Sequence, residues 1–264
     1  MKYETIKLDR DARGVARLTL VRGDKHNALN QAMIRELTDA ATALRDDATI
    51  RAVVLAGEGQ SFCAGADLGW MREQAGQTVE RRLADAAELA GMLAALDSLP
   101  MPLIARVHGP AYGGGVGLVA IADIAIAATE ARFALTEVRL GLVPATIGPY
   151  VVARLGEPVA RRIMMSARPL TASEALAAGL VSAVVAPADL DAALGAEIAT
   201  FLACAPGAVA ATKRLCRHLA RNPGADHAAF TAGLLAERWQ TAEAAEGLAA
   251  FFDKRAPSWR RDVL

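Results

Sequence analysis

The sequence predicts an α/β fold in which helices pack on sheets. Short apolar runs typical of strands alternate with amphipathic helical stripes through the first two thirds of the 264 residues. Two glycine-rich segments, 57–65 and 113–117, follow such apolar runs. From Thr171 onward the pattern is mostly helical. We therefore expect a core at residues 1–195 and a helical region at residues 196–264.

The strands and the first helix of the N-terminal part are predicted from the alternation of apolar and polar residues and from a helix-capping residue. Residues 6–21 read as a β-hairpin, because apolar and polar residues alternate on both sides of the turn-forming residues 11–14. Asn30 is a favourable N-cap for a helix whose apolar stripe runs from Met33 to Leu44. Residues 51–56, RAVVLA, then predict a short buried strand.

The middle of the chain continues with helices and strands in turn. A second amphipathic helix carries an apolar stripe over 83–96 and should end before Pro100. Residues 103–107 predict the next strand, and a helix of small residues follows the glycines of 113–117. Two more strands are expected, at 123–127 and 132–135.

The last third of the chain is predicted from helix start and stop signals. Thr171 to Glu174 form a capping box, and Gly179 ends that helix before a last strand at 181–185. The remaining helices are expected at 188–204, 206–221, 226–240 and 242–252.

Composition excludes several classes of partner. Lys plus Arg equals Asp plus Glu at 29 each, and aromatic residues make up only 5% of the chain, so we expect no nucleic-acid partner. The longest uncharged stretch, 107–122, contains a proline and five glycines and is shorter than the roughly 20 residues of a membrane span. With charges throughout the N-terminus, this predicts a cytoplasmic protein without a membrane partner.

The cysteines and histidines predict neither a disulfide framework nor a metal site. The three cysteines are odd in number and far apart, and no CxxC pair occurs. The four histidines are equally scattered. No metal is therefore expected.

Three glycine-rich or polar segments follow apolar strands: 61–68 (SFCAGADL), 108–118 (HGPAYGGGVGL) and 133–144 (FALTEVRLGLVP). Glycine there lets the backbone approach a ligand, and Gly114 and Gly115 would place N–H groups at a helix N-terminus. Residues 115–120 also fit the dinucleotide motif G-x-G-x-x-A, with Glu137 twenty residues beyond Gly117. Because residues 108–112 separate the strand from the first glycine, we do not favour a dinucleotide site.

Taken together with KHNALN at 25–30, these segments resemble the crotonase (enoyl-CoA hydratase/isomerase) family over nearly the whole chain. The resemblance implies a crotonase-like spiral of ββα repeats with two roughly perpendicular sheets. It also implies a homo-trimer or dimer of trimers, with residues 196–264 serving trimerisation and closure over coenzyme A. The substrate would be an acyl-CoA thioester, and no separate cofactor is expected because coenzyme A is part of the substrate.

The resemblance also implies roles for individual residues. The N–H groups of Ala64 and Gly114 would form an oxyanion hole for the thioester enolate, and Glu137 would move the proton at the α carbon. The implied substrate-binding residues are His26, Ala28, Ala66, Asp67, Leu68, Tyr112, Gly113, Gly117 and Thr136.

One departure from the family pattern leaves the reaction open. Gly117 stands where a hydratase has its other catalytic glutamate. One hypothesis is a hydratase in which Glu137 serves both proton transfers. The alternatives are a 3-enoyl-CoA to 2-enoyl-CoA isomerase with a single glutamate, or an inactive acyl-CoA-binding scaffold.

The finer resemblance concerns the acyl group. GADLGWMR and FALTEVRLGLVPATIGPYVV are most similar to bacterial 3-methylglutaconyl-CoA and isohexenylglutaconyl-CoA hydratases of leucine and acyclic terpene catabolism. Such substrates carry an extra carboxylate, for which Arg72 or Arg139 is the expected partner.

Overall fold

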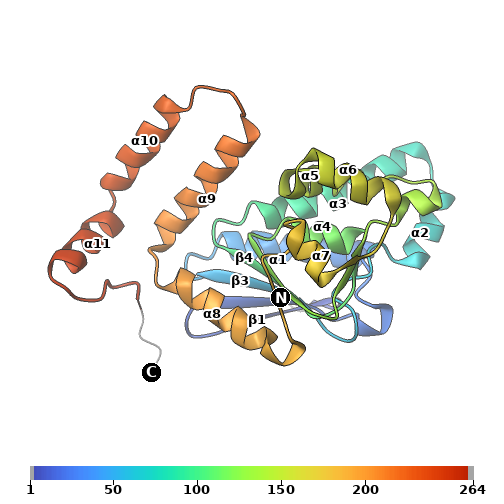
Figure 1. Ribbon diagram of the computed structural model, residues 1–264, viewed down its shortest axis with the longest axis horizontal. Helices are drawn as coiled ribbons and strands as arrows, with labels where there is room; N and C mark the ends of the chain where they lie inside the picture. Colours follow the sequence, from blue (N-terminus) through green and yellow to red (C-terminus); the bar gives the residue numbers. More distant parts are fainter. Residues whose placement is uncertain (1–2, 261–264) are drawn as a thin grey trace.

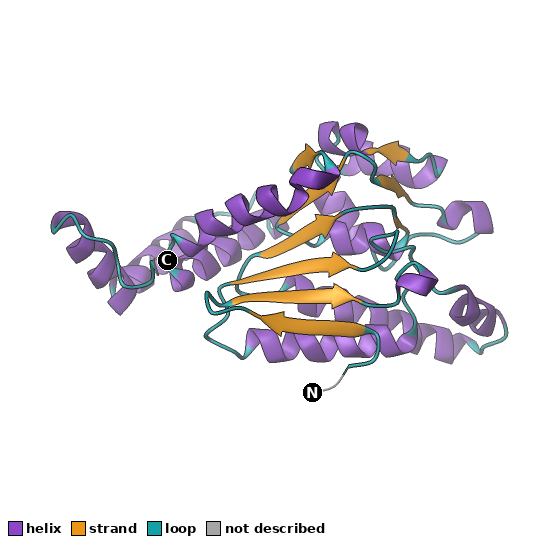
Figure 2. Cartoon of the chain, turned by 90° about the horizontal axis from the view of Figure 1, so that it is seen from below, coloured by secondary structure: helices purple, strands orange, loops and turns teal. Residues whose placement is uncertain are grey.

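The computed structural model describes residues 3–260, and within them it contains two sheets. The larger sheet has six strands in the order β1-β2-β3-β4-β6-β9, which lie side by side in Figure 2. All its neighbours pair in parallel except the β1–β2 hairpin. The strands of this sheet are β1 (Ile6–Arg10), β2 (Val15–Leu20), β3 (Ala52–Gly57), β4 (Leu103–Val107), β6 (Ile124–Ala128) and β9 (Ala183–Val185).

The smaller sheet and the helices complete the α/β fold that the sequence predicts. The order of the smaller sheet is β5-β7-β8, with β5 (Ala111–Tyr112), β7 (Arg132–Ala134) and β8 (Leu170–Thr171). The helices are α1 (Gln31–Arg45), α2 (Leu68–Ala75), α3 (Val79–Asp97), α4 (Gly114–Ala120), α5 (Gly148–Leu155), α6 (Glu157–Ser166), α7 (Ala172–Ala177), α8 (Leu190–Leu202), α9 (Pro206–Arg221), α10 (Ala228–Trp239) and α11 (Ala242–Phe252). Short 3-10 helices are η1 (Gly23–Lys25), η2 (Glu137–Leu140) and η3 (Pro187–Asp189).

Apolar residues on both faces bury the central strands of the large sheet. On one face, Val53 and Leu55 belong to the main core with α1, α3 and α4. On the other face, Val54 belongs to a smaller cluster with Leu190 and Leu194 of α8. A strand buried on both faces reads as a continuous apolar run, which explains RAVVLA.

Several predicted elements are confirmed in detail. The hairpin pairs Ile6 with Leu20. The Asn30 side chain caps α1 by accepting a hydrogen bond from the N–H of Met33 at 2.9 Å. Thr171 and Glu174 form the capping box of α7.

The sequence reading missed α2, α5 and α6. Helix α2 has no buried residue, so it shows no apolar stripe. Helices α5 and α6 are short, and each has a proline in its first turn. The strand predicted at 132–135 is present as β7, but it joins the smaller sheet.

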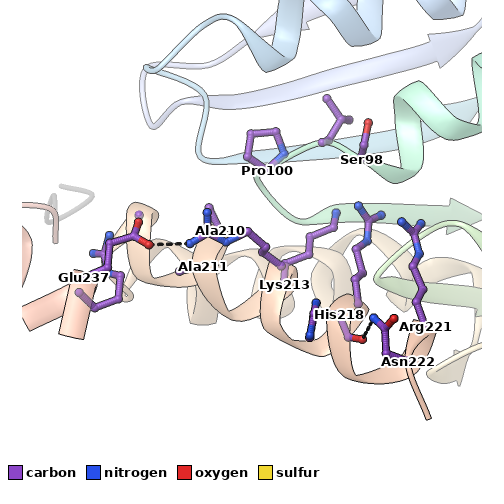
Figure 3. Close-up of a pocket in the computed structure, with 14 residues that line it drawn as sticks. Ser98, Pro100, Ala210, Ala211, Lys213, His218, Arg221, Asn222 and Glu237 are labelled. Atoms are coloured by element: carbon purple, nitrogen blue, oxygen red, sulfur yellow. Dashed lines mark hydrogen bonds and ion pairs between the residues drawn. The ribbon is translucent and has the colours of Figure 1, made fainter. Parts of the chain in front are cut away.

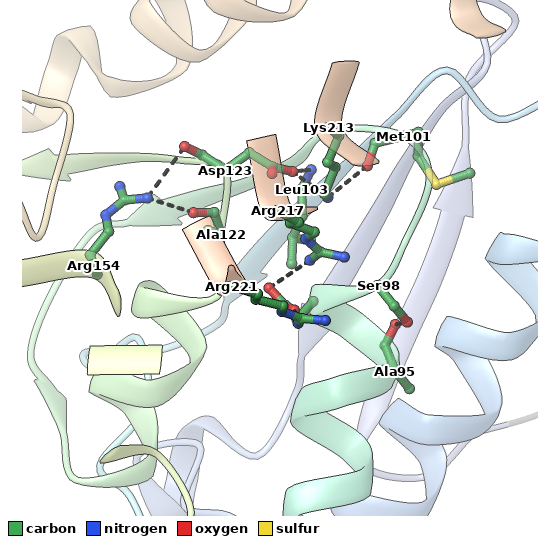
Figure 4. Close-up of polar contacts among 11 residues, drawn as sticks. Ala95, Ser98, Met101, Leu103, Ala122, Asp123, Arg154, Lys213, Arg217 and Arg221 are labelled. Carbon is green, nitrogen blue, oxygen red and sulfur yellow. Dashed lines mark hydrogen bonds and ion pairs between the residues drawn. The ribbon is translucent and has the colours of Figure 1, made fainter. Parts of the chain in front are cut away.

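The helices α9 to α11 project from the core as an arm (Figure 1). Lys213 of α9 lies with its ammonium 2.5 Å from the Asp123 carboxylate, and it also donates to the Met101 carbonyl at 3.2 Å (Figure 4). Arg217, one turn further along α9, pairs with Asp97 at 2.6 Å. The arm is therefore anchored by ion pairs to the residue before β6 and to the end of α3.

Among residues 3–260, no single helix is long and apolar enough to cross a bilayer. The segments Pro187–Leu202 and Pro206–Arg221 meet the length and composition test only when joined across a bend of 100°.

Loss of the Lys213 ammonium should destabilise the fold. Only 10% of its side chain is exposed, so Lys213→Met leaves Asp123 without its cation and should lower the free energy of unfolding by about 2–3 kcal/mol. Arg214→Met, on the same helix, removes a pair with Glu237 whose side chains are 56% and 61% exposed. This control should change stability by about 0.5 kcal/mol or less in urea unfolding. Equal losses in the two variants would contradict the anchoring role of Lys213.

Candidate active site

Two backbone segments meet at the centre of the candidate site. The N–H of Cys63 donates to the Pro110 carbonyl at 3.2 Å, and the N–H of Tyr112 donates to the Cys63 carbonyl at 2.9 Å. A Cβ on Gly115 would lie 2.2 Å from the Cys63 carbonyl oxygen, so only glycine allows this approach. Gly65 has φ +88°, a region that favours glycine.

A third segment fixes the direction of the Ala66 backbone. The N–H of Leu29 donates to the Gly65 carbonyl at 2.7 Å, and the N–H of Asp67 donates to the Leu29 carbonyl at 2.9 Å. In this parallel bridge the N–H of Ala66 points away from Leu29. The start of α4 lies close to this segment, since the nitrogen of Gly114 would be 3.3 Å from a Cβ on Gly65.

The structure corrects the expectation for Ala64. Its N–H donates to the His26 carbonyl at 2.9 Å and is therefore not available to an oxyanion. Within the described part of the chain, no acceptor takes the N–H of Ala66 or that of Gly114. Gly114 opens α4, where first-turn N–H groups have no partner inside the helix. The free donors are thus Ala66 and Gly114. The family resemblance implies Ala64, two residues before the alanine whose N–H is free of a described acceptor.

Glu137 brings a carboxylate to this position. It begins η2 and is partly buried, and its Oε1 would lie 3.1 Å from a Cβ on Gly113. Among residues 3–260, no donor reaches its buried Oε2. Burial raises the pKa of Glu137 above its ordinary value.

The nearby arginines have other partners. Arg139 donates to the Ala167 carbonyl at 2.8 Å, and Arg132 donates to the carbonyls of Thr129 and Ala131. Glu137 is therefore not held as a structural ion pair by either of them.

Apolar side chains surround Gly117, the position where a glutamate would supply a second carboxylate. A Cβ at this position would lie 2.4 Å from Cγ2 of Ile147, a residue that is 2% exposed. It would also contact Cδ2 of Leu93 at 3.8 Å. The space beside Gly117 is filled by apolar side chains, so no carboxylate fits there without movement of Ile147.

The other expected substrate-binding residues lie around these segments. His26 is exposed, and its Nδ1 lies 3.0 Å from Oγ of Ser61. Ala28 is buried, whereas Leu68 is 80% exposed at the start of α2. The Asp67 carboxylate caps α2 and pairs with Arg22 at 2.8 Å.

Two further residues come from the smaller sheet and the segment after it. Tyr112 is half-buried in β5, and Thr136 is the residue before η2. The sequence reading singled out neither Arg22 nor Ile147. Nothing around either residue in the chain distinguishes it from an ordinary surface cation or core residue.

A separate cavity of about 580 Å³ lies between the 98–100 loop and α9 (Figure 3). None of the expected site residues lines it. Its cationic side chains each pair with a carboxylate: Lys213, Arg214, Arg217, Arg221 and Arg238. Among the described residues, no group of three or more His, Cys, Asp and Glu is arranged to hold a metal ion.

Comparisons with known proteins place the chain in a family. Residues 10–262 match the family model described as enoyl-CoA hydratase/isomerase. A probable enoyl-CoA hydratase of Mycobacterium tuberculosis is 36% identical, covering 98% of this chain and 99% of its own length. A putative enoyl-CoA hydratase of Thermus thermophilus is 34% identical over 89% of the chain and 92% of its own length.

Solved structures give the same result. The crystal structure of an enoyl-CoA hydratase from Shewanella pealeana has a TM-score of 0.94 and 38% identity, covering 98% of this chain and 97% of that one. The enoyl-CoA hydratase of Mycobacterium smegmatis has a TM-score of 0.92 and 36% identity, with 98% and 100% covered.

The packing of Gly117 predicts a specific pair of variants. Gly117→Ala places its Cβ against Ile147 and should lower the free energy of unfolding by about 1–3 kcal/mol. Ile147→Ala removes the obstructing Cγ2, so the double variant should lose less than the sum of the two single losses in a urea-unfolding cycle. Additive losses would show that the two positions do not compete for space.

Replacing Glu137 should stabilise the protein at neutral pH. Because the pKa of Glu137 is raised in the folded protein, its ionisation disfavours the fold above the ordinary pKa of a glutamate. Glu137→Gln should therefore raise Tm at pH 7, and the gain should vanish as the pH falls below that ordinary pKa. A Tm difference independent of pH, or a loss at pH 7, would contradict this prediction.

Proposed function

Because the chain belongs to the enoyl-CoA hydratase/isomerase family, we propose that it adds water to the double bond of an α,β-unsaturated acyl-CoA thioester. One observation carries this proposal. The partly buried carboxylate of Glu137 has an oxygen that no donor of residues 3–260 reaches, and it lies against Gly113, next to Gly114, whose N–H has no acceptor in the same range.

The N–H groups of Ala66 and Gly114 would donate hydrogen bonds to the thioester oxygen. Addition of water makes this oxygen an enolate oxygen, and preorganised donors stabilise the charge that develops there. Loss of one donor in a comparable site raises the barrier by about 2.7–4 kcal/mol. This assignment takes the place of Ala64, whose N–H already donates to His26.

Glu137 would carry out both proton transfers. It takes a proton from the attacking water, whose oxygen bonds to the β carbon. It then gives this proton to the α carbon as the enolate collapses, so the product carries the hydroxyl group on the β carbon and the new hydrogen on the α carbon. A carboxylate with a raised pKa is suited to both steps, since it binds and releases a proton closer to neutral pH. Coenzyme A would lie along His26, Ala28 and Leu68, with Tyr112 and Thr136 near the acyl group.

A second candidate activity is the isomerisation of a 3-enoyl-CoA to a 2-enoyl-CoA. The observation that favours it is the packing of Ile147 against Gly117, which leaves an apolar surface where a second acid would orient water. In this reaction Glu137 alone moves a proton from the α carbon to the γ carbon, and no water adds.

The preferred acyl group is proposed to be a branched glutaconyl group, as in leucine or acyclic terpene catabolism. The local resemblance at GADLGWMR and FALTEVRLGLVPATIGPYVV supports it. Arg139 already donates to the Ala167 carbonyl, so the exposed Arg72 of α2 is the better candidate for the substrate carboxylate.

We also propose that the protein is a cytoplasmic homo-trimer or dimer of trimers, in which residues 196–264 serve assembly and closure over coenzyme A. Exposed apolar side chains on the arm support a role in assembly. Phe251 is 76% exposed, Phe252 75% and Trp239 62%. Light scattering measures the assembly directly.

The activity test follows thioester absorbance with crotonyl-CoA, 3-methylglutaconyl-CoA and a 3-enoyl-CoA. Glu137→Gln should lower kcat/KM by about 10²-fold or more, because it removes the proton-transfer group. For the wild type, the acid limb of kcat/KM should lie above the ordinary pKa of a glutamate. Glu88→Gln, which removes a carboxylate that pairs with Arg35 on the surface, serves as the control and should leave activity unchanged.

The outcomes separate the hypotheses. Hydration of either 2-enoyl substrate supports the hydratase, and reaction of the 3-enoyl substrate alone supports the isomerase. Absence of reaction with all three, while a saturated acyl-CoA still binds, would overturn both and leave a scaffold.

A further inference from the structure

Arg22, between β2 and η1, is a mostly buried cation that none of the proposed chemistry uses. Only 17% of its side chain is exposed. One end of its guanidinium, Nη2, lies 2.8 Å from Oδ2 of Asp67, whose side chain is 18% exposed. The other end, Nη1, donates to the carbonyl of Ala28. A single side chain therefore joins the 26–30 segment to the 64–67 segment.

Both partners of Arg22 are adjacent to residues that set the direction of the Ala66 N–H. Ala28 precedes Leu29, which forms the parallel bridge with Ala66, and Asp67 follows Ala66 directly. The bridge itself consists of two hydrogen bonds, 2.7 Å to Gly65 and 2.9 Å from Asp67. The Arg22 guanidinium thus adds two side-chain contacts between the 26–30 and 64–67 segments that this backbone bridge already joins.

Asp67 has a further task at the start of α2. Its Oδ1 accepts hydrogen bonds from the N–H groups of Gly69 at 2.8 Å and Trp70 at 3.3 Å, and so caps the helix. No residue of α2 is fully buried, and Trp70 in its first turn packs partly buried against the main core. The Arg22 side chain therefore also secures the point where the oxyanion segment becomes helix.

We propose that Arg22 is a positioning residue: through its contacts with Ala28 and Asp67 it holds the N–H of Ala66 in line with that of Gly114. This inference rests on the proposed oxyanion role of these two N–H groups. We call these contacts of Arg22 with Ala28 and Asp67 the Arg22 clamp. A displacement of about 1 Å at a reacting group lowers the rate on the order of 10²-fold, so the clamp can affect the rate although Arg22 does not touch the substrate.

The geometry requires arginine rather than any cation. The planar guanidinium presents N–H groups in two directions, one to a carbonyl and one to a carboxylate. A lysine ammonium is a single point charge and cannot span both partners in the same way. Arg22→Lys should therefore behave more like Arg22→Met than like the wild type.

The test uses butyryl-CoA, a saturated thioester, and follows its carbonyl stretching frequency by infrared spectroscopy in the complex. Aligned donors polarise the carbonyl and lower this frequency. Arg22→Met and Arg22→Lys should show a smaller shift than the wild type. With a 2-enoyl-CoA they should lower kcat by about tenfold or more, with a smaller change in KM.

Two further variants separate positioning from folding. Asp67→Asn keeps a good helix cap but loses the charge that pairs with Arg22, so it should reproduce the smaller shift even if the Arg22 variants do not fold. Arg106→Met is the matched control, because Arg106 is 16% exposed and pairs with Asp191 at 2.6 Å on α8. It should lower stability and leave the carbonyl shift and kcat unchanged.

The results distinguish this inference from the proposed function. A wild-type shift without turnover of any enoyl substrate would contradict the proposed reaction and leave the clamp intact. Equal carbonyl shifts in Arg22→Met, Asp67→Asn, Arg106→Met and the wild type would overturn the clamp, whatever the activities.

Discussion

The close approach of two backbone segments is the constraint on which the candidate site depends. Gly115 lies so near the Cys63 carbonyl that a Cβ would be 2.2 Å from its oxygen, and Gly65 turns through a positive φ beside Tyr112. Close to this approach, neither the N–H of Ala66 nor the first N–H of α4 has an acceptor among residues 3–260. Backbone donors fixed in this way need no reorganisation when charge develops on a bound oxygen.

The proposed proton transfers depend on one carboxylate in an environment that disfavours its charge. Burial raises the pKa of Glu137, no described donor reaches its Oε2, and Ile147 fills the space beside Gly117. An ionised carboxylate without a partner works against folding, which is the usual exchange of stability for function at a catalytic site. We propose that this carboxylate and the two N–H groups of Ala66 and Gly114 together support a reaction through an enolate.

Elements with local signals could be predicted from the sequence, and those without them could not. Asn30, the Thr171 capping box and the apolar run RAVVLA each predict a helix start or a strand from a few adjacent residues. Helix α2 has no buried face, so no apolar stripe in the sequence predicts it. The family resemblance implies roles for Gly114 and Glu137, and Glu137 lies against Gly113, the residue before Gly114. Adjacent residues do not separate Ala66 from Ala64, because the direction of the Ala66 N–H depends on a bridge to the distant Leu29.

Exchange of the α hydrogens of butyryl-CoA in D₂O, followed by NMR, tests the central claim that Glu137 and the Ala66 and Gly114 donors together form and stabilise a thioester enolate. This measurement is independent of whether water adds or a double bond moves. We expect exchange with the wild type and almost none with Glu137→Gln. Binding of butyryl-CoA without exchange, or equal exchange in both proteins, would contradict it.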